Sequence, residues 1–229
     1  MAKTAVIAGV GPSLGESLAR RFVEEGCRVG LLARSASYLD ELAADLGEDA
    51  VAAPTDITDP TQVEAGFETI REAFGSIDVL VNHASAAAWK GTTEISPEEF
   101  ESAWRVSAYG ALLCTREVVP EMRDAGHGTI VFTGATSAIR GRDGAIGFSA
   151  AKFAARGMAE SMARELGPEG IHVAHVVIDG QIRGPTTERD DRESLLDPDA
   201  IADSYWHLIQ QDRSSWTLEL DVRPHVEPF

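Results

Sequence analysis

The stretch that decides the fold is residues 5–17, which read Ala5-Val6-Ile7-Ala8-Gly9-Val10-Gly11-Pro12-Ser13-Leu14-Gly15-Glu16-Ser17. The apolar run predicts a buried strand, the glycines predict a tight turn, and the residues after the turn predict the start of a helix. Glycine removes side chains where backbone must approach a diphosphate, and a helix N-terminus offers free amide hydrogens. The segment therefore predicts a dinucleotide-binding turn. An ordinary strand-to-helix turn is the alternative.

Short β-branched runs alternate with longer helical patterns over the whole chain of 229 residues. We expect strands at residues 4–8, 28–32, 50–54, 79–82, 129–133, 172–178 and 216–220. We expect helices at residues 14–25, 38–46, 60–74, 97–124, 149–165 and 198–209. This order is typical of βαβ units around a parallel sheet, and the length suits one core. The sequence predicts one α/β domain over residues 1–229: a doubly wound Rossmann-type fold with a seven-stranded parallel sheet and helices on both faces.

The charge balance is strongly acidic, with 37 Asp and Glu against 20 Lys and Arg and a formal net charge of −17. Nucleic acid is excluded as a partner, because phosphate binding needs clustered basic residues that this chain lacks. An acidic surface poor in lysine would stay soluble at high salt, which favours a halophilic source. An ordinary acidic protein is the alternative, and unfolding measured at low and at molar KCl separates the two.

Other patterns in the sequence exclude further classes of protein. No stretch approaches the roughly 18 uninterrupted apolar residues of a membrane helix, and the first residues lack a signal-peptide layout. We therefore expect a cytoplasmic protein with no membrane partner. Cys27 and Cys114 lie far apart and are predicted to be buried small residues. His172 and His175 fall on opposite faces of a predicted strand, so no metal site is expected.

The end of the second predicted strand bears on the choice of coenzyme. NAD sites usually place an acid here for the ribose hydroxyls, whereas this chain has Arg34 and Ser35 and no acid. A guanidinium can pair with a ribose 2′-phosphate. The sequence therefore predicts NADP(H) in preference to NAD(H), with a solvated arginine at a helix start as the alternative.

The order of these motifs resembles the short-chain dehydrogenase/reductase family along essentially the whole chain. Residues 8–15 match its TGxxxGxG motif, with Gly9 and Gly15 kept, Ser13 at the middle glycine and an extra Gly11. The acid that caps adenine in the family corresponds to Asp56, the NNAG stretch to residues 82–85, and the YxxxK signature to residues 148–152.

Motif and resemblance together imply a set of coenzyme-binding residues. They are Gly9, Gly11, Ser13, Leu14, Gly15, Arg34, Ser35, Asp56, Ile57, Asn82, Ala84, Lys152, Ile178, Gly180 and Ile182. After the sixth strand the family usually has Pro-Gly and then a threonine that touches nicotinamide. Here Asp179 replaces the proline, and the threonine position corresponds to Gly184, with Thr186 and Thr187 close behind.

The resemblance also implies a changed catalytic site. In the family a tyrosine moves the proton, a lysine lowers the tyrosine's pKa and holds the ribose, a serine binds the substrate oxygen, and an asparagine completes a relay. Lys152 is present here, although a chance surface lysine is the alternative. The tyrosine, serine and asparagine positions correspond to Phe148, Ala135 and Ser107.

A phenyl ring cannot supply the proton that a reduced carbonyl needs. The substitutes we consider are Ser137, Thr136, an ordered water and, last, Ser149, which a one-residue step on a helix turns away by about 100°. His83 could titrate near neutrality, but packing beneath the coenzyme is the preferred role.

Two functional hypotheses follow. The first is an NADP(H)-linked oxidoreductase acting on a small carbonyl or alcohol with a non-standard proton donor. The second is a catalytically silent NADP-binding protein that serves as a sensor or structural partner. Residues 184–197 are hypothesised to be a substrate lid, with a solvated loop as the alternative. Small residues along 147–166 predict a homodimer or homotetramer, unless that helix packs on its own sheet.

Overall fold

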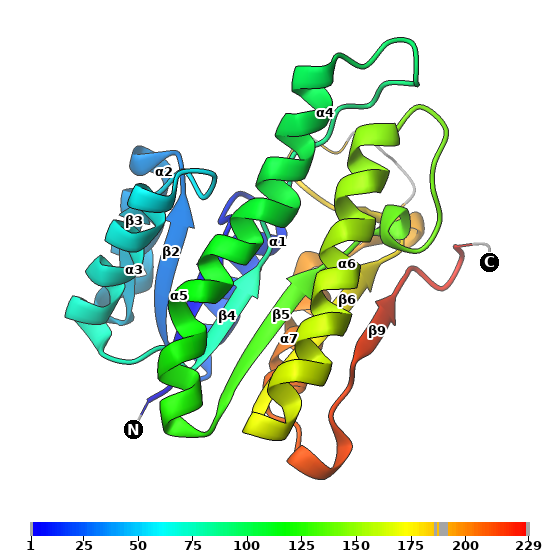
Figure 1. The fold of residues 1–229 in the computed structure, drawn as a ribbon. Helices are drawn as coiled ribbons and strands as arrows, with labels where there is room; N and C mark the ends of the chain where they lie inside the picture. The colour runs from blue at the N-terminus through cyan, green and yellow to red at the C-terminus, as the bar shows by residue number, and fades with distance from the viewer. Residues whose placement is uncertain (1, 186, 188–191, 228–229) are drawn as a thin grey trace.

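A seven-stranded parallel sheet forms the centre of the molecule in the computed structural model, which describes residues 2–185, 187 and 192–227 (Figure 1). The strand order is β3-β2-β1-β4-β5-β6-β9. The bounds are β1 Thr4–Ala8, β2 Arg28–Ala33, β3 Ala50–Pro54, β4 Val79–Asn82, β5 Gly128–Thr133, β6 Ile171–Ile178 and β9 Glu219–Val222. The predicted fold class is confirmed: one Rossmann-type α/β domain.

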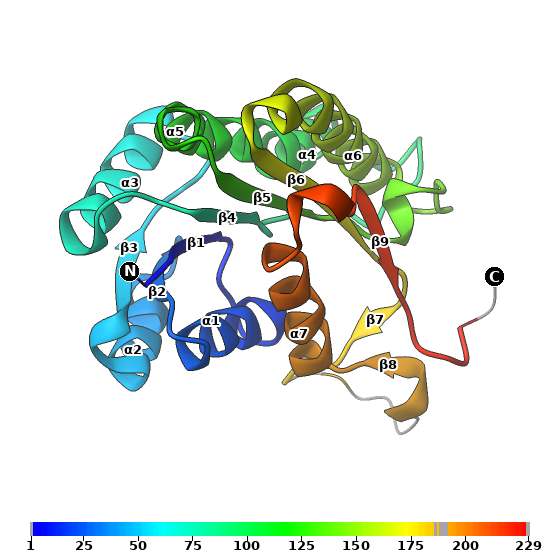
Figure 2. The same ribbon diagram turned by 90° about the horizontal axis from the view of Figure 1, so that it is seen from below.

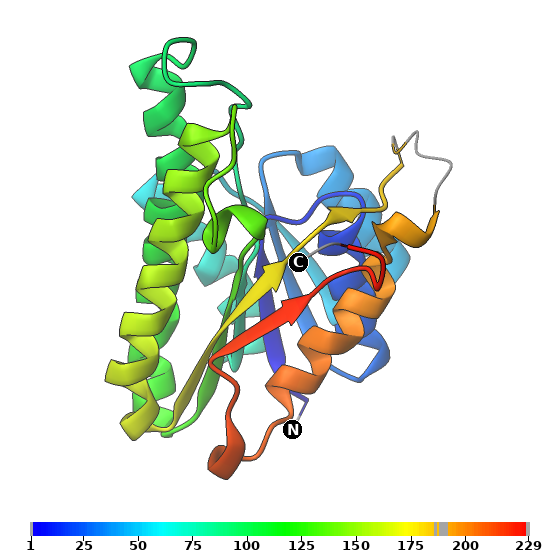
Figure 3. The same cartoon turned by 90° about the vertical axis from the view of Figure 1, so that its right-hand side faces the viewer.

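Helices cover both faces of the sheet (Figure 2). One layer holds α1 Leu14–Glu24, α2 Ala36–Leu46 and α7 Pro198–Ile209, and the other holds α3 Pro60–Phe74, α4 Pro97–Trp104, α5 Gly110–Ala125 and α6 Ile146–Leu166. Figure 3 shows the sheet edge-on between these layers. All strands are parallel, so their carboxyl ends meet along one edge, where a doubly wound fold binds its ligands.

Alternate residues of the strands pack into two separate hydrophobic cores, one on each face of the sheet. In β1, Ala5 and Ile7 pack in the core under α1, α2 and α7, whereas Val6 and Ala8 pack in the core under α3, α5 and α6. Side chains of a strand point alternately to its two faces, which explains why this strand is buried at every position. A continuous apolar run, rather than an alternating one, is therefore what fixes β1 in the middle of the sheet.

Several predicted boundaries differ from the structure. The helix expected at residues 97–124 is interrupted by a π-helical turn at Arg105–Tyr109. The helix expected to start at residue 149 starts at Ile146, which puts Phe148 in its first turn. The last strand lies at Glu219–Val222, because Trp216 instead stacks on the ring of His172 at 5.0 Å.

A small feature that the sequence did not predict follows β6. β7 Gln181–Ile182 and β8 Leu195–Leu196 pair as a separate two-stranded ribbon at the ends of the predicted lid, residues 184–197. Residues 186 and 188–191 of that segment, Thr186 among them, lie outside the described residues.

Two expectations about burial can be compared with the structure. Cys27 and Cys114 are both buried free thiols, as predicted. Within residues 2–185, 187 and 192–227, no helix is both long enough and apolar enough to cross a membrane.

Candidate coenzyme and active site

The glycine turn after β1 depends on Gly9. Its φ of +110° is a conformation that L side chains rarely adopt, and a Cβ here would lie 2.4 Å from the backbone nitrogen of Ala84. The amide of Gly9 donates to the carbonyl of Leu32 at 2.8 Å, which ties the turn to the end of β2. Glycine at this position therefore lets the backbone pass directly against the strand-end loop after β4.

The first turn of α1 presents amide hydrogens at the same edge. The amides of Glu16 and Ser17 donate to the carbonyls of Gly11 and Ser13. Within the described part of the chain, the amides of Leu14 and Gly15 have no backbone acceptor, as is usual in the first turn of a helix. A diphosphate is the kind of ligand that such a turn accommodates, so the backbone fits a dinucleotide.

Ser13 stands where a glycine would be easier to accommodate. Its φ of +92° is the one positive φ of a non-glycine among the described residues. Its Oγ donates to the carbonyl of Arg183 at 2.7 Å, and a Cβ on Gly184 would lie 3.8 Å from the Cβ of Ser13. The described start of the predicted lid therefore lies directly against the glycine turn.

A cavity of about 470 Å³ lies beside this turn. It brings together six of the predicted coenzyme residues: Gly9, Arg34, Ser35, Asp56, Ile57 and Ala84. Ala33 also lines it, so no acid stands at the end of β2. The Oδ1 atom of Asp56 accepts from the amide and the hydroxyl of Thr58, which fixes the carboxylate at the cavity wall. This hollow is the candidate site for the adenosine part of a dinucleotide.

A second cavity, of about 290 Å³, adjoins the first and shares His83 and Ser85 with it. Its lining contains seven of the predicted site residues: Ala135, Ser137, Phe148, Lys152, Ile178, Gly180 and Ile182. Asn82 and Ser107 line neither cavity. Asn82 is buried and donates through Nδ2 to the hydroxyl of Thr115, whereas the buried Ser107 hydroxyl has no partner within the described residues. Ser107 lies inside the π-helical turn.

Lys152 is a buried cation at the wall of the second cavity. Its side chain is only 3% exposed, and its Nζ donates to the carbonyl of Thr133 at 2.8 Å. The same nitrogen lies 5.6 Å from the centroid of the Phe148 ring. Burial disfavours the charged form and lowers the pKa of Lys152 to about 8. Lys152 is therefore no chance surface lysine.

The hydroxyl groups near Lys152 differ in what they can still bind. Thr136 donates to Oδ1 of Asp179 at 2.6 Å, and the Ser149 hydroxyl accepts from the amide of Arg142. Ser137 lines the cavity, and its buried Oγ has no hydrogen-bond partner in the described residues. Of the serine and threonine hydroxyls we considered, Ser137 is the one that lines this cavity and keeps its bonding capacity for a ligand.

His83 lies where the two cavities meet. Burial, reinforced by the charge of Lys152, lowers the pKa of His83 to about 4, so the imidazole is neutral near pH 7. Its Nδ1 lies 3.2 Å from the hydroxyl of Thr133, which in turn lies 2.8 Å from the hydroxyl of Tyr205. His83 therefore does not titrate near neutrality, and its place in this chain agrees with the packing role.

Three residues that shape this region could not be recognised as such from the sequence motifs: Trp89, Arg142 and Asp179, which forms ion pairs. Asp179 is fully buried and lies 3.1 Å from Arg140 and 3.3 Å from Arg223. Trp89 packs on Phe148 with ring centroids 5.1 Å apart. The arginines of the segment 140–142 were a usable signal, because they follow a predicted strand in a chain with few basic residues.

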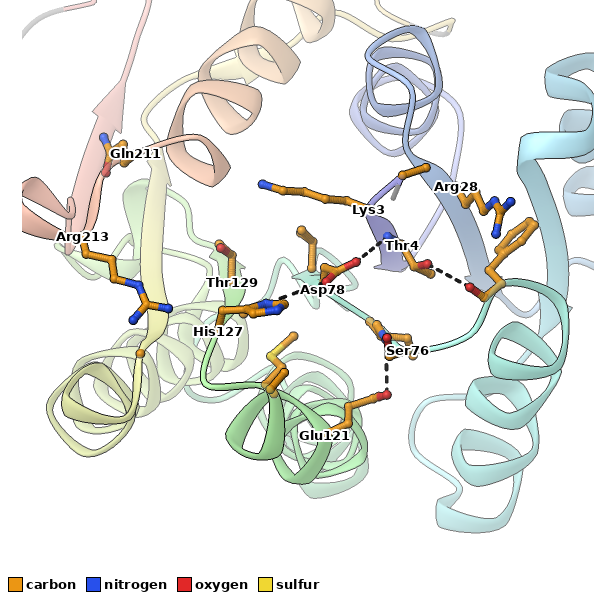
Figure 4. A pocket seen from close by; sticks show the side chains of 18 of the residues that line it. Lys3, Thr4, Arg28, Ser76, Asp78, Glu121, His127, Thr129, Gln211 and Arg213 are labelled. Carbon is orange, nitrogen blue, oxygen red and sulfur yellow. Dashed lines mark hydrogen bonds and ion pairs between the residues drawn. The ribbon is translucent and has the colours of Figure 1, made fainter.

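A larger hollow, of about 820 Å³, lies at the opposite edge of the sheet (Figure 4). Lys3, Thr4 and Arg28 reach it from the starts of β1 and β2, and Asp78 precedes β4. Asp78 already accepts from the amide of Thr4 at 2.8 Å. Parallel sheets bind ligands at the carboxyl ends of their strands, whereas this hollow lies at the amino ends. It is therefore not the coenzyme site that we propose.

The comparison with protein-family models decides the family. The model described as short chain dehydrogenase matches residues 3–193. The chain belongs to the short-chain dehydrogenase family. It is therefore an oxidoreductase-family protein with an NAD(P)-binding fold, as the resemblance implied.

Individual relatives agree with this assignment along nearly their full length. An uncharacterized oxidoreductase of Staphylococcus haemolyticus is 28% identical over 225 residues, which are 97% of each chain. Among solved structures, a 3-ketoacyl-(acyl-carrier-protein) reductase from Brucella melitensis complexed with NADH is 28% identical, with a TM-score of 0.91 and 97% of each chain covered. A short-chain dehydrogenase from Rhodopseudomonas palustris is 31% identical, with a TM-score of 0.85, and 97% of this chain and 99% of that one are covered.

Proposed function

We propose that the protein is an NADP(H)-dependent reductase of small carbonyl compounds in which Lys152, not a tyrosine, supplies the proton. The observation that supports this most is the continuity of two cavities: one beside the glycine turn, and one that is lined by Lys152. They share His83 and Ser85, so a dinucleotide held by the turn would extend toward the lysine. When bound, NADPH supplies the hydride.

The preference for NADP(H) rests on Arg34. At the end of β2, the residues Ala33, Arg34 and Ser35 line the adenosine cavity with no acid among them, and the acid elsewhere in its lining, Asp56, accepts hydrogen bonds from Thr58. The side chain of Arg34 is exposed, and no described carboxylate lies within 4 Å of it, so its donors are available. A metagenomic short-chain oxidoreductase in complex with NADP, 25% identical with a TM-score of 0.85 over 98% of each chain, is among the similar structures.

Replacing Arg34 by alanine is expected to weaken NADPH binding by about 10- to 100-fold, the worth of a charge-assisted hydrogen bond. NADH, which lacks the 2′-phosphate, is expected to bind as before. Titration of coenzyme fluorescence measures both affinities. Arg116→Ala is the matched control, because Arg116 is exposed on α5 and has no ion pair among described residues. An equal loss for both coenzymes in Arg34→Ala would argue against this preference.

The groups that line the cavity of Lys152 decide which of them can supply the proton. When the carbonyl carbon accepts the hydride, the C=O electron pair moves onto oxygen, which then needs a proton. Phe148 has no proton to give, and Thr136 already donates to Asp179. The Lys152 ammonium has donors beyond the one on Thr133, and its pKa of about 8 suits a general acid near neutrality. Ser137 would hold the substrate oxygen by hydrogen bonding.

This assignment fixes the pH dependence of the reduction. Lys152 is protonated below its pKa of about 8 and neutral above it. The rate of NADPH-dependent reduction is therefore expected to be constant at lower pH and to fall about tenfold per pH unit above that value. In Lys152→Met this fall of the rate above about pH 8 is expected to disappear. Coenzyme affinity of the variant is measured separately. A rate that stays flat from pH 7 to 10 would contradict Lys152 as the acid.

Oxidation of NADPH across a panel of aldehydes and ketones tests the function as a whole. Turnover of at least one carbonyl compound is the expected result. Tight NADPH binding without turnover of any of them would instead support the catalytically silent sensor or structural partner.

We also propose a homodimer or homotetramer formed through the outer layer of α4, α5 and α6. The small residues Gly147, Ala151 and Ala155 do not face outward; they are buried within the chain, which is the packing that we weighed as the alternative. Large apolar side chains are nevertheless exposed on these helices: Phe100, Trp104, Leu112, Ile146 and Phe153. The molar mass in solution tests this, and a monomer at every concentration would reject it.

A further inference from the structure

A row of aromatic and cationic side chains forms one wall of the cavity that Lys152 lines. Lys152 Nζ lies 5.6 Å from the Phe148 ring, the Phe148 and Trp89 rings are 5.1 Å apart, and the guanidinium of Arg142 lies 5.9 Å from the Trp89 ring. The row thus begins at the proposed proton donor and ends at an arginine. An apolar group that lies along the two rings would have a cation at each end.

The arginine at the end of the row connects two hollows. Arg142 lines the 290 Å³ cavity and also an adjoining hollow of about 710 Å³. Trp89, Thr136 and Gly180 line both as well, so the two hollows are continuous. A substrate that enters from the larger hollow would therefore pass Arg142 before it reaches Lys152.

Arg142 has no ion-pair partner in the described part of the chain. Among the described residues, no carboxylate lies within 4.0 Å of its guanidinium, although the chain carries a net charge of −17. The neighbouring Arg140 differs, because it is paired with Asp179. Glu227 lines the larger hollow but not the smaller one, and it forms no ion pair with Arg142.

The backbone that carries Arg142 is held in place. Its amide donates to the hydroxyl of Ser149, in α6. Two residues earlier, Arg140 is anchored on the buried Asp179, which also accepts from Thr136. A binding group on a fixed loop loses less entropy when it engages a ligand.

On the proposed function, we infer that the substrate is a carbonyl compound bearing a carboxylate, which Arg142 binds, with an apolar portion that lies against Trp89 and Phe148. A guanidinium matches a carboxylate with two parallel hydrogen bonds, which distinguishes an acid from its ester. The aromatic rings would supply the apolar surface between the carboxylate and the reacting carbonyl.

Calorimetry tests this with aromatic oxo acids and their methyl esters, added to the protein saturated with NADP⁺ so that nothing turns over. The acids are 4-acetylbenzoate, 4-acetylphenylacetate and 3-(4-acetylphenyl)propionate, in which the ring lies between the carbonyl and the carboxylate and the two groups are at increasing distance. At least one acid is expected to bind about 10- to 100-fold more tightly than its ester. Arg142→Ala is expected to abolish this difference and to leave ester binding unchanged.

Arg28→Ala is the matched control. Arg28 also lies over an aromatic ring, 5.8 Å from that of Phe74, but at the opposite edge of the sheet. The Arg28→Ala variant loses one positive charge and one cation–ring contact, as Arg142→Ala does. We expect it to bind the acids more tightly than the esters, as the unmodified protein does. If no acid binds more tightly than its ester, or if Arg142→Ala weakens both equally, the inference is overturned. Failure of the proposed function is seen separately, as absent NADP⁺ binding or absent NADPH oxidation.

Discussion

Introducing serine at Ala135 and tyrosine at Phe148 together is expected to raise kcat/KM for NADPH-dependent carbonyl reduction by about 10- to 100-fold, less than the full 10²–10⁴ of general acid catalysis because Lys152 already supplies a proton. Both residues line the cavity of Lys152, and Phe148 already packs against that ammonium. A phenol there would have a cation beside it to lower its pKa, and the new serine would offer a hydrogen bond to the substrate oxygen. Initial rates on the carbonyl panel measure the gain.

The control for this double variant is Phe153→Tyr, which adds a phenol to an exposed position of the same helix. It is expected to leave the rate unchanged. The double variant should also become less sensitive to pH near the pKa of Lys152, since the lysine no longer supplies the proton. Absence of turnover in both the unmodified protein and the double variant, with coenzyme binding intact, would mean that the substrate pocket does not hold a carbonyl near Lys152.

Changing Gly9 to alanine is expected to destabilise the protein by about 2–4 kcal/mol and to reduce NADPH affinity at least tenfold. The added Cβ would meet the backbone of Ala84 at 2.4 Å, and alanine would have to adopt a φ of +110°. Relief of this contact requires the loop after β4 to move away from the turn, which would displace residues that line both cavities. Chemical denaturation and coenzyme titration measure the two effects.

Gly157→Ala provides the comparison for Gly9→Ala. Gly157 lies on α6, and a Cβ there would meet no atom within 4 Å. The same substitution is expected to stabilise the protein by about 0.5–1 kcal/mol, because alanine favours a helix. Equal stability changes at the two positions would show that the close approach of Gly9 to Ala84 does not matter.

The sequence predicted the architecture because its signals were local and mutually consistent. Residues 5–17 contain a fully apolar strand, a glycine turn and a helix start, and the caps Asp59 and Ser96 mark where α3 and α4 begin. Each of these features depends on a few neighbouring residues, so it can be recognised before the tertiary structure is known.

The features that the sequence did not predict depend on contacts between distant parts of the chain. Nothing in the local pattern of residues 97–124 marks the π-helical turn at Arg105–Tyr109, whose Ser107 and Ala108 are buried against other elements. The start of the last strand moved because Trp216 found His172 as a stacking partner 44 residues away along the chain, a pairing that is not local. Tertiary packing overrode a propensity in each case.

The residues of the candidate site also fall into two groups, those that a sequence motif identifies and those that only the fold brings together. Gly9, Arg34, Asp56 and Lys152 were found because they belong to motifs at fixed spacing, and the structure places them at the walls of two joined cavities. Arg142 and Trp89 belong to no motif, so only the fold brings them together. Ser107 and Asn82 were expected at the site but line neither cavity, because their side chains are buried behind it.

Coenzyme binding is best tested by calorimetric titration of the unmodified protein with NADPH and with NADH, at a salt concentration where the chain is folded. We expect saturable binding of NADPH at micromolar to millimolar concentration and binding at least tenfold tighter than that of NADH. Absence of heat from both coenzymes at millimolar concentration would contradict the proposed function, because the glycine turn would then hold no dinucleotide and Lys152 would have no reaction to serve.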